Sequence, residues 1–120
     1  MLQPVWIHDN ASAGAARPYA AEHNSLDLGS ASITVESGDA SGQVHLEIEL
    51  PEAFDALEVG VVTGADLPRV RFVDADFEER DGSPVVVDVD LVGVRKERGS
   101  TYPAGPLASL RSGTSRVRVW

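Results

Sequence analysis

Hydrophobic and polar residues alternate along much of this chain with a period of two, which predicts β-strands. The clearest case is residues 43–50, where every even-numbered residue is apolar and every odd-numbered residue is polar. Such alternation is typical of a strand with one buried face, so Val44, Leu46, Ile48 and Leu50 are expected to face the core. Shorter alternations predict further strands at 26–35, 57–63, 69–73 and 115–120.

The longest predicted strand is 85–94, because four apolar residues there share one parity: Val85, Val87, Val89 and Leu91. We expect this strand to form a hairpin with residues 69–76, since Asp81-Gly82 between them is a turn signal. That pairing sets apolar side chains opposite each other. It also places Arg71 diagonally from Asp90 on the outer face, where the two charges would attract.

Two short helices interrupt the predicted strands. Pro51 ends the strand before it, and residues 51–56 are expected to make a single helical turn. Residues 105–113 resemble a second helix, with Pro106 in its first turn and Gly113 just past its end. In that helix Leu107 and Leu110 would pack over one end of the core.

These patterns together predict an all-β fold. We expect a small antiparallel β-sandwich, immunoglobulin-like or jelly-roll-like, with six to eight strands and one short helix near the C-terminus. No long amphipathic helices separate the strands, which argues against a parallel α/β fold. The 120 residues are expected to form a single domain, 1–120, in which the Ala-, Gly- and Ser-rich segment 9–25 forms an arm or a mobile loop.

Composition limits the kinds of cross-link and metal site that the protein can have, and it bears on its cellular location. The chain has no cysteine, so neither disulfides nor thiolate metal sites are available to it. Its first residues lack a basic stretch followed by an apolar run, and no apolar run is long enough to cross a membrane. We therefore expect a protein made in the cytoplasm, without a signal peptide or a transmembrane segment.

Charge is strongly segregated. The net charge is −9, yet residues 95–120 hold six basic residues and one acid. An acidic chain repels nucleic acid and anionic membranes, so neither is an expected partner. The basic segment would either meet an acidic protein surface, such as a second copy, or be neutralised internally. Internal neutralisation requires the last strand to lie beside residues 43–50, with Arg116 and Arg118 near Glu47 and Glu49.

Basic and aromatic side chains outside the inferred core are the candidates for an interface. Exposed aromatic residues with polar neighbours are typical of protein interfaces and also stack on sugars. The predicted interface residues are Arg95, Arg98, Arg116, Arg118, Trp120, Trp6 and Tyr102.

Acidic residues crowd between positions 74 and 81. Loop carboxylates of this kind are ligands that calcium prefers, so the sequence predicts a calcium site at Asp74, Asp76, Glu78 and Asp81. The loop lacks the glycine that an EF-hand has at its sixth position, where this chain has Glu79. The alternative is a solvated hairpin tip whose charges discourage pairing between sheet edges.

Catalytic motifs are absent from the sequence. It has no cysteine nucleophile, no G-x-S-x-G elbow and no glycine-rich phosphate loop. His8, His23 and His45 lie far apart, although His8 on a terminal strand would be able to meet His45 across a sheet. We therefore predict no catalytic residues and no enzyme activity.

Three functional hypotheses remain. The first is a non-enzymatic structural or assembly protein that binds itself or another subunit, for example a phage head or tail accessory protein located in the virion. The second is a calcium-dependent carbohydrate-binding module. The third is a small β-barrel enzyme that uses carboxylates.

Overall fold

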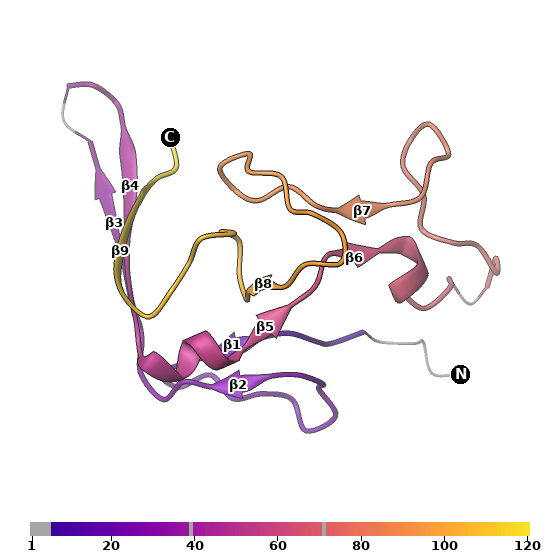
Figure 1. Ribbon diagram of the computed structural model, residues 1–120, viewed down its shortest axis with the longest axis horizontal. Helices are drawn as coiled ribbons and strands as arrows, with labels where there is room; N and C mark the ends of the chain where they lie inside the picture. Colours follow the sequence, from indigo (N-terminus) through magenta and orange to yellow (C-terminus); the bar gives the residue numbers. More distant parts are fainter. Residues whose placement is uncertain (1–5, 39, 71) are drawn as a thin grey trace.

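The computed structural model describes residues 6–38, 40–70 and 72–120, and its fold is all-β, as predicted (Figure 1). Nine short strands are described, with two single-turn 3-10 helices between them. They run in the order β1 (Ala11–Ser12), β2 (Leu26–Asp27), β3 (Ser32–Ser37), β4 (Val44–Leu50), η1 (Glu52–Ala56), β5 (Glu58–Val59), β6 (Val62–Thr63), η2 (Gly64–Asp66), β7 (Val86–Val87), β8 (Tyr102–Pro103) and β9 (Gly113–Arg118).

The largest sheet is antiparallel, with β4 in the middle and β3 and β9 at its edges. Figure 1 shows it projecting from one end of the molecule. The predicted alternation of β4 is confirmed, because Ile48 is buried while Glu47 and Glu49 are exposed. Arg116 lies opposite Glu47, so the last strand does lie beside β4, while Arg118 lies opposite His45.

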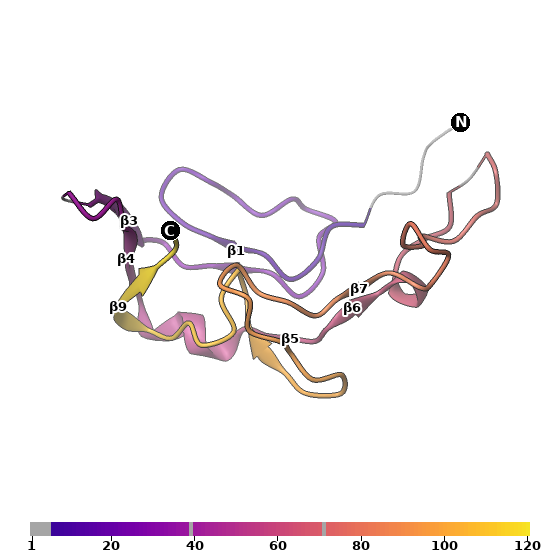
Figure 2. The same ribbon diagram turned by 90° about the horizontal axis from the view of Figure 1, so that it is seen from above.

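The remaining strands form three two-stranded sheets. β5 pairs with β8 and β6 pairs with β7, both antiparallel, while β1 and β2 are parallel. The sequence predicted one antiparallel sandwich, whereas the strands are divided among several small sheets. Figure 2 shows the β1 region on one side of the β5–β6 segment.

A small core lies where β4, η1 and the segment after β8 meet. Its buried residues are Ile48, Phe54, Leu57, Ala104, Leu107 and Leu110. The helical turn expected at 51–56 is confirmed as η1, and it delivers Phe54 to this core. No polar side chain is buried among the described residues, so apolar contacts alone form the interior.

The predicted strand 85–94 and its hairpin with 69–76 are wrong. Only Val86–Val87 is a strand, and it pairs with β6. Residues 72–74 form a turn that brings Val70 beside Ala75, and Arg69 closes that turn through ion pairs with Asp74 and Asp76. Asp90 ends the other strand, because its carboxylate accepts hydrogen bonds from backbone amides ahead of it and so favours a turn. Arg71 lies outside the described residues.

The helix predicted at 105–113 is also wrong, because this segment is a single turn. The N–H of Leu110 donates to the carbonyl of Leu107, but that of Ala108 donates to the Asp90 side chain. One backbone donor of the segment therefore bonds outside it, and the Leu107–Leu110 turn is not continued into a helix. The burial of Leu107 and Leu110 over the core was nevertheless predicted correctly.

The fold is extended for its size. Its radius of gyration is 16.7 Å, compared with about 14 Å for a compact chain of this length. Several large apolar side chains outside the core are exposed, notably along β3 and between residues 87 and 94. Within the described residues no helix is long and apolar enough to cross a membrane.

Candidate functional site

Three aromatic rings from the N-terminal part of the chain stack together. The Trp6 and His8 rings lie 4.6 Å apart between centroids, at an interplanar angle of 16°. His23 lies against the other histidine, with ring centroids 5.0 Å apart. A parallel bridge joins His8 to His23, so backbone pairing sets the spacing of these two rings.

Two strained residues fix the backbone beside this stack. Asp9 and Asn24 follow the two histidines, and both adopt positive φ angles, 64° and 51°. Asx residues tolerate this conformation because their short side chains bond locally. The Asn24 amide donates to the Asp9 carboxylate at 2.7 Å and to the backbone carbonyl of Glu58 at 3.2 Å. The strained pair thereby ties the stack to β5.

A hollow of about 330 Å³ opens between the stack and the β5–β6 segment. Its size lies within the range of small-molecule sites. It combines an indole ring, an imidazole, two carboxylates and backbone from the β5–β6 connection. The residues that line it are Trp6, His8, Asp9, Gly60, Val61, Val62 and Asp66.

The carboxylate of Asp66 is held in place on the rim of this hollow. Its Oδ2 accepts hydrogen bonds from the backbone N–H and the hydroxyl of Thr63, each at 2.8 Å. These two bonds, the backbone one foremost, lower the pKa of Asp66. Asp66 is therefore a fixed, ionised acceptor at neutral pH.

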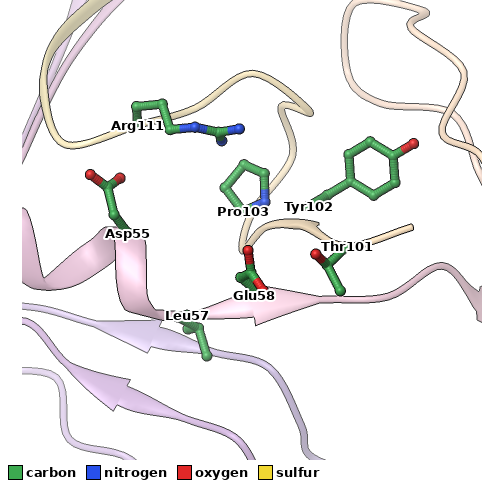
Figure 3. A pocket seen from close by; sticks show the side chains of 7 residues that line it. All are labelled: Asp55, Leu57, Glu58, Thr101, Tyr102, Pro103 and Arg111. Atoms are coloured by element: carbon green, nitrogen blue, oxygen red, sulfur yellow. The ribbon is translucent and has the colours of Figure 1, made fainter. Parts of the chain in front are cut away.

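A second, smaller pocket lies beside β8 (Figure 3). It has a volume of about 90 Å³, below the range of small-molecule sites. Asp55 on its rim accepts hydrogen bonds from the hydroxyl and backbone N–H of Ser112, and these lower the pKa of Asp55. The Tyr102 hydroxyl accepts from the backbone N–H of Glu97 at 2.6 Å. The side chains of Asp55 and Tyr102 thus already serve contacts within the fold.

The predicted calcium ligands do not assemble. Asp74 and Asp76 pair with Arg69 at 3.2 and 3.0 Å, and Asp81 accepts hydrogen bonds from the backbone and hydroxyl of Ser83. Across residues 6–38, 40–70 and 72–120, no three His, Cys, Asp or Glu side chains converge as a metal site would require. Asp74 and Asp76 instead share Arg69 as their partner, and Asp81 is bonded within its own turn.

The structure spreads the predicted interface residues over several elements. Arg95 pairs with Asp88 at 2.6 Å, and Arg116 pairs with Glu36 at 2.9 Å. Arg118 lies opposite His45 and donates to the backbone carbonyl of Trp120. Arg98 and Trp120 are exposed, the latter at 81%, while Tyr102 lies in the small pocket beside β8 and only Trp6 lies in the larger hollow.

Sequence reasoning missed the partner of His8, which is His23 and not His45. A signal for it was present, because a His-Asx dipeptide recurs with a spacing of 15 residues, at His8-Asp9 and His23-Asn24. The two histidines form an isolated parallel bridge, and the residue after each of them has a positive φ angle.

One solved structure, that of XylC in complex with xylose, matches this fold with a TM-score of 0.81 and 29% sequence identity. The match covers 98% of this chain. This chain resembles a segment of XylC. It spans only 18% of the XylC chain, so the likeness concerns one part of a much longer protein. No protein-family model and no curated protein sequence matches the chain.

Proposed function

We propose that this chain is a non-enzymatic carbohydrate-binding domain that holds a pentose such as xylose in the hollow beside Trp6. The observation that carries the proposal is the combination of an indole ring and the fixed Asp66 carboxylate in one hollow of suitable size. A sugar ring has an apolar face that stacks on indole and hydroxyls that donate to carboxylates. From XylC the proposal takes only the sugar class.

Binding fits the carboxylates better than catalysis does. A glycosidase needs one carboxyl whose pKa is raised, so that it can act as a general acid. Among the described carboxyls whose pKa is shifted, hydrogen bonds lower it in every case, at Glu22, Asp55, Asp66, Asp81 and Asp90. These acids are suited to accept hydrogen bonds and not to donate protons.

The proposal replaces the phage head or tail role, for which the comparisons offer no support. It also departs from the calcium-dependent form of the sugar-binding hypothesis, because the acidic loop bonds to its own arginine and serine. Binding is therefore expected to be unchanged by EDTA. A requirement for calcium would contradict this part of the proposal.

The chain contains two tryptophans, which allows a direct test. In a Trp120→Phe background Trp6 is the sole indole, and titration with xylose or xylobiose should change its fluorescence saturably. The acyclic sugar alcohol xylitol serves as the ligand control, since it has no ring to stack.

The sugar affinity of variants, measured by calorimetry, then tests whether the sugar contacts Trp6. We expect Trp6→Ala to weaken binding at least about tenfold, equivalent to about 1.4 kcal/mol. The matched control Trp120→Ala removes an exposed indole elsewhere and should bind like the original chain. Equal affinity for Trp6→Ala and Trp120→Ala would place the sugar elsewhere, and no saturable signal with either sugar would overturn the proposed function.

A further inference from the structure

β3 is an edge strand whose outer side pairs with no other described strand. It is regular over six residues, in register with β4 from Ser32 to Ser37. In such an edge every second residue directs its backbone N–H and C=O outward, where another strand can bond to them. The free side of β3 is therefore able to pair with an additional strand.

The apolar face of the sheet continues onto this edge without cover. Ile33 lies opposite Ile48, and Val35 lies opposite Leu46. Ile48 is buried, yet Ile33 and Val35 are 67% and 63% exposed. Since apolar surface is stabilised by removal from water, an added strand beside β3 would extend the core face.

β3 also lacks the features by which edge strands avoid association. It contains no proline, no lysine and no glycine, and its single charge is Glu36. That carboxylate pairs with Arg116 of β9 at 2.9 Å, so its charge is neutralised from within the sheet. Natural edges usually rely on lysine, proline or bulges to prevent pairing.

The sequence of β3 is complementary to itself. In an antiparallel pairing of two copies about Thr34, Ile33 of each copy lies opposite Val35 of the other. Ser32 then lies opposite Glu36, so no like charges meet. A shift by one residue would set apolar side chains against the polar face, which disfavours that register.

The accessible surface of this chain is larger than that of a compact protein of the same mass. Its accessible surface is 8283 Å², about 2,000 Å² more than a compact protein of 12.8 kDa exposes. A standard interface needs about 800 Å² from each partner. The excess over the whole chain is larger than the area that one partner of a standard interface buries.

From these observations we propose that two copies of this chain pair through β3 about a two-fold axis. The dimer contains one six-stranded sheet, in the order β9-β4-β3-β3-β4-β9. The interface is isologous and closes on itself. It is separate from the hollow beside Trp6, so it does not depend on the proposed sugar binding.

The absence of cysteine provides the first test. Residues opposite each other at the two-fold lie about 4.5–5.5 Å apart between Cα atoms, within disulfide range. With diamide as oxidant, Thr34→Cys should convert to a covalent dimer within minutes. The matched control Thr114→Cys, exposed on the other edge strand of the same sheet, should remain monomeric.

Light-scattering mass across a concentration series gives the second test. We expect the mass of the original chain to rise to twice 12.8 kDa, while Val35→Lys stays at the mass of one chain. Val87→Lys, at an exposed valine of β7, should dimerise normally. Circular dichroism confirms that each variant is folded.

Three results would overturn the proposal. They are a single-chain mass at every concentration, dimerisation of Val35→Lys equal to that of the original chain, and equal cross-linking of the two cysteine variants. The first would mean that β3 does not pair with a second copy of this chain.

Discussion

Asp90 uses both carboxylate oxygens to join two loops over the core. Oδ1 accepts from the backbone N–H groups of Val92 and Val94 at 3.0 and 2.8 Å, and Oδ2 accepts from that of Ala108 at 3.0 Å. These bonds, the one from Ala108 foremost, lower the pKa of Asp90. One side chain therefore positions the loop that buries Leu107.

We expect Asp90→Asn to lower the midpoint of urea unfolding at pH 7, because the amide cannot accept all three bonds. The folded-state pKa lies below the ordinary value of 3.8, so the contribution is complete above about pH 4 and is lost as pH falls through the lowered pKa. The difference between the variant and the original chain should shrink accordingly in acid.

The control for this experiment is Glu79→Gln, at an exposed acid of the acidic loop. It should leave the midpoint unchanged at pH 7. An equal loss in both variants would mean that net charge, and not the Asp90 contacts, controls stability.

At the scale of elements, prediction succeeded where alternation alone decides the structure. β4 and β9 lie near their predicted places, because one apolar face and a flanking turn suffice to define them. It failed for 85–94, whose valines alternate equally well. There the Asp90 carboxylate accepts hydrogen bonds from backbone amides that a strand would use in its ladder. Residue type alone does not indicate whether such a side chain will end a strand.

The candidate site was less predictable than the fold. Trp6 was predicted as an interface residue, whereas the place of Asp66 in the same hollow and the contact of His23 with His8 were not predicted. Asp66 lies on a 3-10 turn and His23 on a parallel bridge, and neither location follows from local periodicity. The approach of Asp66 to Trp6 and that of His23 to His8 depend on contacts between segments far apart in sequence, which alternation does not encode.

Gly64 starts η2 where two segments approach closely. Its N–H donates to the carbonyl of Val85 at 2.8 Å, and an added Cβ would lie 2.7 Å from the carbonyl oxygen of Phe77. We expect Gly64→Ala to cost about 1–3 kcal/mol in the free energy of unfolding, measured with urea. The matched control Gly60→Ala meets nothing within 4 Å and should be near neutral. Equal costs at the two positions would contradict this contact.

At the scale of the whole molecule, a small core supports an extended fold. Six buried apolar residues hold β4, η1 and the segment after β8 together. Folded domains are stable by only about 5–15 kcal/mol, so losing one of these side chains removes a large share of that stability.

Leu107, 1% exposed, is the most buried side chain of this core. We expect Leu107→Ala to destabilise the fold by about 2–5 kcal/mol in urea unfolding, with a broadened transition. Leu91→Ala, at an exposed leucine, should change the stability by less than about 0.5 kcal/mol. Similar losses at the two leucines would show that the core extends beyond the six residues.

The position of β4 between β3 and β9 also governs how this protein folds. β4 meets β3 through a short connection, but its other neighbour lies more than sixty residues further along the chain. Closing so long a loop is entropically costly, and topologies dominated by distant pairings fold slowly. Until β9 arrives, β4 has an open, apolar edge, and intermediates of this kind are prone to aggregate. During synthesis, this period of risk lasts until β9 has emerged from the ribosome and paired.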